Sequence, residues 1–349
     1  MPHRMVLTVL TFCSLAVGSA ARAASCEEVD GIESICDLQA PEDLVLAPDG
    51  RFVLFSQMVP AGGLKALDTR DDSVIDLYPA AGADNSEGWG ASDCPGPPGD
   101  SMEAHGIDLR QRSDGRWVLL VVNHGGRESL EFFELLQTPD ASPQVQWRGC
   151  VLAPEDAYIN DVVLLPDGGF LATHMFSRSG QAWGLIKSML GFDTGYVYRW
   201  DEALGFIQVP GTDIPFPNGI ALAADDRYFF VNSYSAGEVR KYALKGGEPV
   251  AVAQVSSPDN SSWDSHGRLL VASHQHSLSN LGDAFPNDDG TPIDLHFIIV
   301  ALDPNTLDSE NIWEHQGPPM GGATVALEVD GYLYMGSFAG DRMIRIPMP

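Results

Sequence analysis

The sequence predicts an all-β fold, a six-bladed β-propeller. One observation is a polar turn followed by a β-prone apolar run, which occurs six times along the chain. Another is that almost no long helical periodicity lies between these copies. Radial repetition of small antiparallel sheets accounts for such a pattern. A β-sandwich is the structural alternative, but it does not require six copies of one phrase.

The six turns define the units in chain order. They end at Gly50, Gly115, Gly168, Asp226, Gly267 and Gly331. Aspartate and glycine tolerate positive φ, which makes Asp-Gly between β-prone runs a strong hairpin signal. Successive turns are 41 to 65 residues apart. Six four-stranded units therefore use the whole chain after its first residues.

Three segments interrupt the strand pattern. Residues 80–104 and 276–292 are rich in Gly, Pro and polar residues and are predicted to be loops. Residues 181–192 place apolar side chains at helical spacing. We expect a short amphipathic helix there, which either covers blade edges or forms one wall of a pocket.

The N-terminus has the pattern of a cleaved signal peptide. Arg4 precedes an apolar run over 5–17, and Ala21-Arg22-Ala23 fits a signal-peptidase site. The run is shorter than the ~20 residues of a membrane span, so no transmembrane segment is expected. We predict that residues 1–23 are removed and that 24–349 form a single propeller domain. The expected location is the periplasm or the extracellular space.

Cysteine usage agrees with export. Removal of residues 1–23 leaves Cys26, Cys36, Cys94 and Cys150, and an even number of cysteines in an exported chain suggests disulfides. Three pairings are open. We favour the local one, Cys26–Cys36 with Cys94–Cys150.

A formal net charge of −28 argues against binding to nucleic acid or an anionic membrane, because both require basic surface. Solubility is the simplest explanation of the charge, and attraction of a divalent cation is a further one. The sequence leaves the oligomeric state open.

Oxygen-bearing side chains recur at one offset before the turns. Glu42, Asn160 and Asn218 each precede the turn residue by eight, and Asn260, beside Asp259, precedes it by seven. Equal register in repeated units places such side chains around the common axis. Together with Asp43 and Asp161 they offer only oxygens, which suits Ca²⁺, whereas zinc would require His or Cys. The predicted propeller thus has a central metal-binding tunnel. Each residue alone would more often be a turn or cap residue.

Two histidines extend this candidate site. His105 lies ten residues before Gly115, near the level of the oxygen ligands, and His124 ends the β-run that follows the turn. A neutral imidazole near a bound cation can take a proton from water; a histidine satisfied by the backbone is the structural alternative. No Gly-x-Ser-x-Gly motif or phosphate-binding glycine loop is present, so an acyl-serine mechanism lacks support.

These motifs resemble the serum paraoxonases, arylesterase/lactonases within the gluconolactonase-like six-bladed propellers. The resemblance covers roughly residues 38–345. It rests on motifs in family order: Glu42-Asp43-Leu44, His105-Gly106-Ile107, Leu119-Leu-Val-Val-Asn-His124, Asn160-Asp161-Val162, Asn218-Gly219-Ile220 and Asp259-Asn260. The run that ends in His124 is the most specific of them.

The resemblance implies two calcium ions in the tunnel. The catalytic ion would be held by Glu42, Asn160, Asn218, Asp259 and Asn260, and the structural one by Asp43, Asp161 and the carbonyl of Ile107. It also implies that His105 and His124 form a dyad in which His105 activates water for hydrolysis of a small-molecule lactone or aryl ester.

The chain departs from the family at two points. No cysteine follows Cys150, so the family's disulfide between the N- and C-terminal regions is absent and ring closure must depend on strand pairing. Residues 181–192 fall where the family has a pocket-lining helix, but their sequence differs. A gluconolactonase-type sugar lactonase and a non-catalytic propeller with structural calcium remain alternatives, and a strictosidine-synthase-like propeller is a more distant one.

Overall fold

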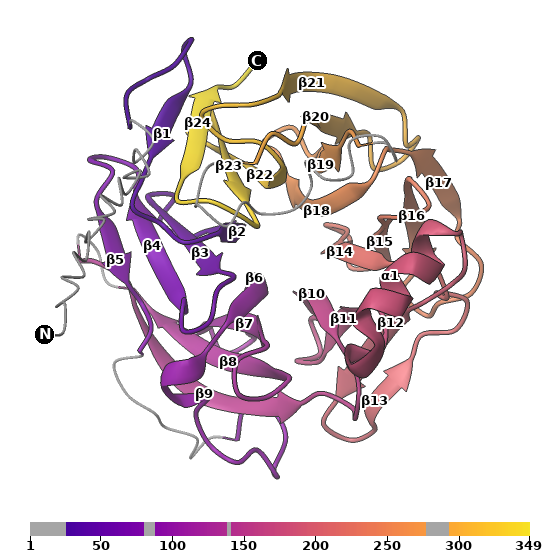
Figure 1. The fold of residues 1–349 in the computed structure, drawn as a ribbon. Coiled ribbons are helices and arrows are strands. Elements are labelled where there is room, and N and C mark those ends of the chain that lie inside the picture. The colour runs from indigo at the N-terminus through magenta and orange to yellow at the C-terminus, as the bar shows by residue number, and fades with distance from the viewer. Residues whose placement is uncertain (1–25, 80–87, 138–140, 277–292) are drawn as a thin grey trace, which may run out of the picture.

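The computed structural model describes residues 26–79, 88–137, 141–276 and 293–349. Six four-stranded antiparallel sheets surround a central axis, which confirms the predicted six-bladed propeller (Figure 1). The predicted signal peptide, 1–23, lies outside the described residues. The same is true of 80–87 and 277–292, which hold most of one predicted loop and part of the other.

Each of the first three blades is built from four consecutive strands. Blade 1 holds β2 (Pro41–Leu46), β3 (Phe52–Gln57), β4 (Leu64–Asp68) and β5 (Val74–Asp76). Blade 2 holds β6 (Ala104–Gln111), β7 (Trp117–Asn123), β8 (Ser129–Leu136) and β9 (Gln144–Leu152). Blade 3 holds β10 (Ile159–Leu164), β11 (Phe170–His174), β12 (Tyr196–Asp201) and β13 (Gly205–Gln208).

The remaining blades follow the same plan until the last. Blade 4 holds β14 (Pro217–Leu222), β15 (Tyr228–Ser233), β16 (Glu238–Ala243) and β17 (Ala251–Gln254). Blade 5 holds β18 (Pro258–Trp263), β19 (Leu269–His274), β20 (Phe297–Leu302) and β21 (Ser309–His315). Blade 6 holds β22 (Ala323–Val329), β23 (Tyr332–Ser337), β24 (Met343–Pro347) and, as its outermost strand, β1 (Glu33–Ile35).

The N-terminal strand closes the ring. β1 pairs antiparallel with β24, with Glu33 opposite Arg345 and Ile35 opposite Met343. Nε of Arg345 also donates to Glu33 at 2.9 Å. The ring is thus closed by strand pairing between the two ends of the chain, since no cysteine after Cys150 is available for a disulfide between them.

The six predicted turns all connect the two innermost strands of a blade. Each turn residue has positive φ, from 55° at Asp226 to 89° at Gly115 and Gly168. In blade 6 both loop residues, Asp330 and Gly331, have positive φ, as expected for a two-residue hairpin loop. The turn prediction is confirmed.

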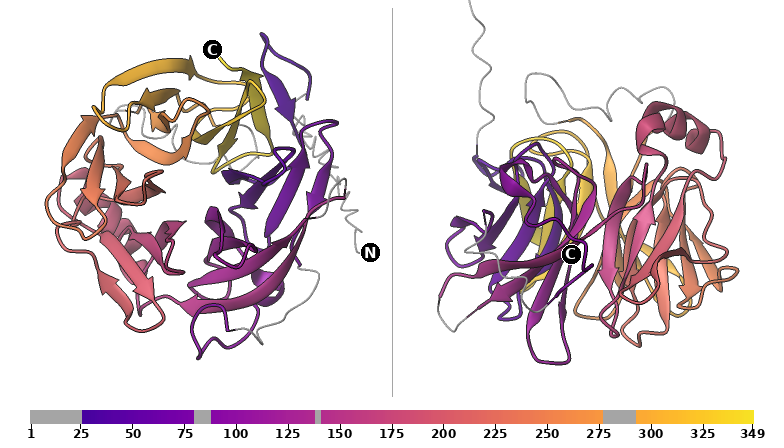
Figure 2. Two further views of the ribbon diagram at one scale, coloured as in Figure 1. Left: turned by 180° about the vertical axis from the view of Figure 1, so that it is seen from behind. Right: turned by 90° about the horizontal axis from the view of Figure 1, so that it is seen from below.

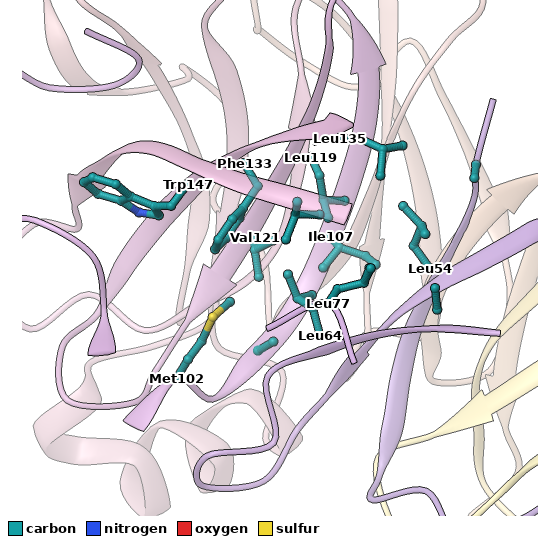
Figure 3. Close-up of a cluster of buried hydrophobic side chains, with 14 of the residues drawn as sticks. Leu54, Leu64, Leu77, Met102, Ile107, Leu119, Val121, Phe133, Leu135 and Trp147 are labelled. Carbon is teal, nitrogen blue, oxygen red and sulfur yellow. The ribbon is translucent and has the colours of Figure 1, made fainter. Parts of the chain in front are cut away.

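Apolar side chains fill the space between neighbouring blades. Figure 3 shows the cluster between blades 1 and 2, where Leu54 and Leu64 pack near Leu119, Phe133 and other buried residues of blade 2. Because each blade buries its faces against its neighbours, the inner strands are held rigidly around the axis.

One helix lies above a single face of the ring (Figure 2). It is α1 (Gln181–Met189), which follows the 3₁₀ turn η2 (Arg178–Gly180). The other short turn, η1 (Gly99–Ser101), lies in the segment before β6. No helix in the described ranges is both long enough and apolar enough to span a membrane.

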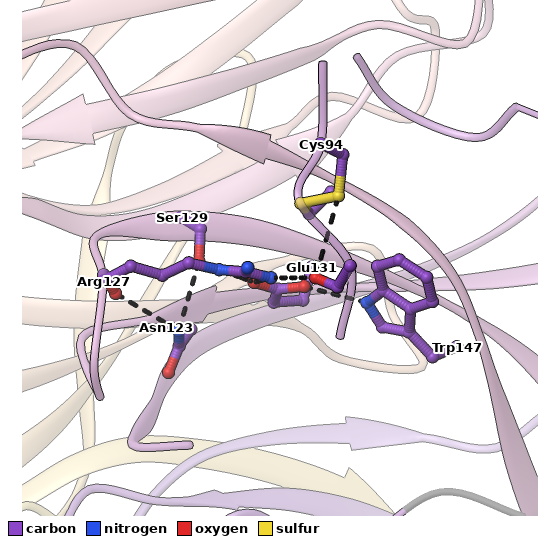
Figure 4. The surroundings of a disulfide bond; sticks show 8 residues. Cys94, Asn123, Arg127, Ser129, Glu131 and Trp147 are labelled. Carbon is purple, nitrogen blue, oxygen red and sulfur yellow. Dashed lines mark hydrogen bonds and ion pairs between the residues drawn. A yellow bond between two sulfur atoms is a disulfide. The ribbon is translucent and has the colours of Figure 1, made fainter. Parts of the chain in front are cut away.

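Both favoured disulfides are present, Cys26–Cys36 and Cys94–Cys150. Figure 4 shows the surroundings of the second one, where Arg127 donates to the carbonyl of Gly96 at 2.6 Å and Trp147 donates to Glu131 at 2.9 Å. The disulfide and the Arg127–Gly96 bond hold the segment before β6 against blade 2, and that segment leads directly into His105. The Trp147–Glu131 bond joins β8 and β9 within the blade.

Candidate active site on the propeller axis

The innermost strands place two consecutive side chains at the axis. A strand normally turns successive side chains to opposite faces. Each innermost strand here has a register shift near its start, as between Pro41 and Leu44 in β2 and between Ile159 and Val162 in β10. A β-bulge of this kind re-aims a side chain, which explains how Glu42 and Asp43 can both serve the axis.

The second residue of each innermost strand borders one large cavity. These six residues are Glu42, His105, Asn160, Asn218, Asp259 and Thr324. The cavity has a volume of about 780 Å³ and is called the main cavity below. Asn260 precedes its turn residue by seven positions, whereas Glu42, Asn160 and Asn218 precede theirs by eight, so Asn260 is not at the equivalent position of its strand. Asp259 occupies the position equivalent to Glu42, and Asn260 is the third residue of its strand.

Four buried oxygens at this level have no hydrogen-bond partner in the described structure. They are Oε2 of Glu42 and Oδ1 of Asn160, Asn218 and Asn260. The nitrogens of two of these amides do have partners: Asn260 donates to Oε1 of Glu42 at 2.7 Å, and Asn160 contacts Sδ of Met175 at 3.4 Å. Buried polar atoms are rarely left unpaired, because each costs about 1–3 kcal/mol. The residues therefore fit a hard cation.

The charge around these oxygens supports the same fit. Burial, the carboxylate of Glu42 and that of Asp161 raise the pKa of Asp259 well above its usual value. Among the described residues, no three His, Cys, Asp or Glu side chains are arranged to hold a metal by themselves. Amide oxygens would have to complete the coordination, which is usual for calcium and unusual for zinc.

Asp43 and Asp161, the third residues of β2 and β10, line a second cavity of about 260 Å³, which is called the lower cavity below. Asp43 accepts hydrogen bonds from the N–H groups of Leu44 and Ile107, both at 2.8 Å. Asp161 accepts from Val162 at 2.7 Å and from Ile220 at 2.8 Å. Each carboxylate thus links its own blade to the next one.

Burial raises the pKa of both carboxyl groups in the lower cavity. For Asp161 it reaches about 8. For Asp43 the neighbouring Asp161 and Glu42 carboxylates add to the effect of burial. Two buried carboxylates that repel each other would be relieved by a cation between them.

The two candidate histidines are in contact. Nδ1 of His105 lies 2.8 Å from Nε2 of His124, and Nε2 of His105 lies 3.6 Å from Oε1 of Glu42. The β6–β7 hairpin brings them together, since Ala104 pairs with Asn123. His124 also meets Glu128, with Nδ1 2.9 Å from Oε2.

The two rings differ in their tendency to take a proton. Burial lowers the pKa of His105, but the carboxylates of Glu42, Asp161 and Glu128 outweigh it, so the net shift is upward. Burial lowers the pKa of His124, and the neighbouring His105 adds to that effect. His105 is thus the better proton acceptor of the pair.

The walls of the main cavity are apolar and aromatic. The ring of Phe216 packs between those of Phe176 and Tyr234, with centroid distances of 5.3 Å to Phe176 and 5.1 Å to Tyr234. Leu185 and Met189 of α1 line the same space. The helix predicted over 181–192 ends at Met189 and forms one wall of the cavity, which was one of its two predicted roles.

Several residues at the site carry weak signals in the sequence. Glu128 follows His124 by four residues in a loop, without a motif. Tyr158 lines the cavity, and its ring centroid lies 4.8 Å from that of His124. His274 also lines it and bonds through Nδ1 to the hydroxyl of Tyr234 at 2.9 Å, whereas Nδ1 of His174 accepts from the N–H of Tyr158 at 3.2 Å.

Residues 115–279 match the family model described as "SMP-30/Gluconolactonase/LRE-like region". Over these residues, slightly less than half of the chain, the six-bladed propeller resembles that family. The matched region runs from β7 to just past β19 and includes Asn160, Asn218, Asp259 and Asn260.

Two curated relatives extend the comparison. Serum paraoxonase/arylesterase 1 of Mus musculus is 25% identical over 326 residues, which are 90% of this chain and 86% of that protein. Protein strictosidine synthase-like 3 of Arabidopsis thaliana is 28% identical over 124 residues, or 34% of this chain. That match spans 32% of the plant protein's length.

Solved structures share the fold of this propeller. A gluconolactonase from Xanthomonas campestris aligns with a TM-score of 0.51 and 17% identity, over 91% of this chain and 89% of that one. Regucalcin from Agrobacterium tumefaciens, described as a calcium-binding protein, aligns with a TM-score of 0.51 and 12% identity, over 90% and 92%. At these identities the likeness shows the fold alone.

Proposed function

We propose that the gluconolactonase-like propeller is a calcium-dependent hydrolase of small lactones and aryl esters, similar to the serum paraoxonases. One observation carries the proposal. Glu42, Asn160 and Asn218, each with an unpartnered buried oxygen, border one largely apolar cavity. His105, which is hydrogen-bonded to His124, borders the same cavity. The relatives named for lactonase, arylesterase and calcium-binding properties agree with it.

The proposed ligands of the catalytic ion are Glu42, Asn160, Asn218, Asp259 and Asn260, and those of a second, structural ion are Asp43, Asp161 and the carbonyl of Ile107. Bound calcium would supply Lewis-acid polarisation of the substrate carbonyl and stabilise its developing negative charge. The protein's contribution is to keep these oxygens fixed on rigid inner strands, so that binding needs little rearrangement.

His105 is the proposed general base. Its Nε2 faces the main cavity beside Glu42, where it can take a proton from an attacking water. His124 supports it through the 2.8 Å bond at Nδ1. The aromatic walls bind the apolar part of the substrate and exclude bulk water, which strengthens electrostatic interactions at the floor.

The same walls favour apolar substrates. A sugar lactone presents several hydroxyl groups, each of which needs a hydrogen-bond partner when it is buried. Phe176, Phe216, Leu185 and Met189 provide none, and most of the lining is apolar, although Gln181, Ser235 and Tyr234 also border the cavity. Lactones with alkyl or aryl substituents therefore fit the main cavity better.

A sugar lactonase of the gluconolactonase type is the second candidate. The match of residues 115–279 to the SMP-30/gluconolactonase model favours it. Turnover of a panel of sugar, alkyl and aryl lactones separates the two candidates, because only the first should prefer apolar substrates.

The first prediction concerns calcium and His105. Removal of calcium with EDTA should abolish hydrolysis of alkyl lactones and aryl acetates, and added calcium should restore it. The variant His105→Gln should lower kcat by about 10²-fold or more, because it lacks the base. Steady-state assays with and without calcium measure both effects.

His315→Gln is the matched control, since His315 lies on the outermost strand of blade 5 and bonds to Gly317. Its activity should equal that of the wild type. Undiminished hydrolysis after chelation would refute the mechanism. A chelated protein that melts at lower temperature, together with no turnover of any ester, would indicate structural calcium in a non-catalytic propeller.

We also propose that the protein is exported. Its two disulfides suit an oxidising compartment, and residues 1–23 have the signal-peptide pattern. The single-domain organisation of 24–349 is part of the same proposal.

A further inference from the structure

Glu128 lies at one end of a chain of hydrogen bonds that reaches the main cavity. Its Oε2 is 2.9 Å from Nδ1 of His124, and Nε2 of His124 is 2.8 Å from Nδ1 of His105. His105 borders the cavity. The side chain of Glu128 is only 8% exposed, so this carboxylate requires compensation from specific partners.

Two donors fix the carboxylate independently of the histidines. Its Oε1 accepts from the N–H of Ile159 at 2.7 Å, and Ile159 directly precedes Asn160 in β10. Nη1 of Arg178 lies 3.0 Å from Oε2, and Nη2 of the same arginine donates to the carbonyl of His124 at 3.0 Å. Glu128 therefore connects the histidine pair, the strand of a proposed calcium ligand and the turn before α1.

The hydrogen bonds determine where the protons lie. An ionised carboxylate can only accept, so Nδ1 of His124 must carry a hydrogen. In a neutral ring Nε2 of His124 is then an acceptor, and Nδ1 of His105 must donate to it. This leaves Nε2 of His105 with a free electron pair. That nitrogen is the one nearest Glu42, 3.6 Å from Oε1.

We infer that Glu128 is a positioning residue that sets the tautomers of both histidines and so directs the free electron pair of His105 into the main cavity. The inference rests on the proposed hydrolase function. When Nε2 of His105 takes a proton from water, the ring becomes an imidazolium. The negative charge of Glu128, two hydrogen bonds away, then stabilises that cation.

Replacement of Glu128 by glutamine distinguishes the proposed role from a purely space-filling one, because glutamine keeps the shape of the side chain but not its charge. The buried N–H of Ile159 is fixed in the backbone and needs an acceptor, whereas the side chain of Arg178 is 38% exposed and can turn to solvent. The amide oxygen of Glu128→Gln should therefore face Ile159, and its NH₂ group should face His124. Nδ1 of His124 must then accept, and both tautomers reverse. Nε2 of His105 would carry a hydrogen and could no longer act as a base.

The expected result is a fall in kcat of about 10²-fold or more with KM little changed. Glu128→Gln should be at least as impaired as Glu128→Ala, although it preserves the shape of the side chain. The matched control is Glu131→Gln. Glu131 is a buried glutamate three residues away that bonds to Arg127 and Trp147 and contacts neither histidine. That variant should lose stability but keep its kcat.

A second readout does not depend on turnover. ¹⁵N NMR of histidine-labelled, calcium-supplemented protein, at a pH where both rings are neutral, should show the Nδ1–H tautomer for His105 and His124. Glu128→Gln should show Nε2–H for both. An Nε2–H tautomer in the wild type would overturn the inference, as would a glutamine variant milder than the alanine variant. If no ester is hydrolysed, the proposed function fails while the tautomers still test the role of Glu128.

Discussion

At the axis, hydrogen bonds donated by the side-chain nitrogens of two asparagines leave their oxygens free to bind a cation. The nitrogens of Asn260 and Asn160 are occupied by Glu42 and Met175, so their oxygens remain for the axis. Unpaired buried oxygens cost about 1–3 kcal/mol each. The fold therefore carries a local instability that a bound cation can relieve.

The substitution Asn160→Leu tests this interpretation. Without calcium, the free energy of unfolding should stay the same or rise, because leucine removes an unsatisfied polar atom. With calcium, the variant should gain less stability than the wild type, by about 1.4 kcal/mol for each tenfold loss of affinity. Urea unfolding with and without calcium measures both quantities.

Thr212→Val is the control for this prediction. Thr212 is also buried, but its hydroxyl bonds to the backbone of Val197 and Val209 and to none of the proposed ligands. Its loss should destabilise the protein equally with and without calcium. Equal calcium-dependent stabilisation of Asn160→Leu and wild type would show that Asn160 is not a ligand.

At the scale of strands and helices, the sequence predicted what repeats and little of what connects the repeats. The turns carry a local signal, since Asp and Gly tolerate the positive φ that a hairpin needs. The pair Glu42-Asp43 was recognisable as a doublet. The β-bulge that turns both side chains to the axis is a property of strand pairing, and a single strand's sequence does not encode it alone.

The residues that hold the site in place, such as Glu128, were also hard to predict, because their contacts come from other blades. Glu128 meets Ile159 and Arg178 only because blades 2 and 3 are neighbours in the ring. The helical spacing in 181–192 indicated an apolar face but not what that face would cover. Contacts of this kind arise from the tertiary arrangement, and local propensity contains no information about them.

The two sides of α1 should affect activity differently. Leu185 lines the main cavity, whereas Trp183 is 59% exposed and does not border it. Leu185→Ser should raise KM for alkyl lactones several-fold with little change in kcat, because it removes apolar contact with the substrate. Trp183→Ser should leave both constants unchanged. Steady-state kinetics on one alkyl lactone suffices, and equal effects of the two substitutions would contradict the assignment of α1 as a cavity wall.

The whole molecule depends on one short strand for closure. Ile32, just before β1, and Ile35, its last residue, belong to two different apolar clusters of the ring. It also covers the edge of β24, which would otherwise present unpaired backbone groups to solvent. Since the disulfide Cys26–Cys36 joins two residues on the same side of this closure, it cannot hold the ring shut.

Deletion of residues 26–35 from the mature chain should therefore open blade 6 and leave the residues at the axis in place. The deletion is combined with Cys36→Ser, because loss of Cys26 would otherwise leave a free thiol. Burial of an isoleucine contributes about 1.5–3 kcal/mol, so the loss of two should lower Tm by about 5 °C or more. The exposed edge of β24 should also promote self-association, visible by size-exclusion chromatography. A synthetic peptide spanning residues 26–40 should restore Tm in proportion to its concentration, by mass action, whereas a scrambled peptide should not. A deletion variant that remains monomeric and melts like the wild type would show that β1 is dispensable and that packing of β22 against β2 is sufficient to close the ring.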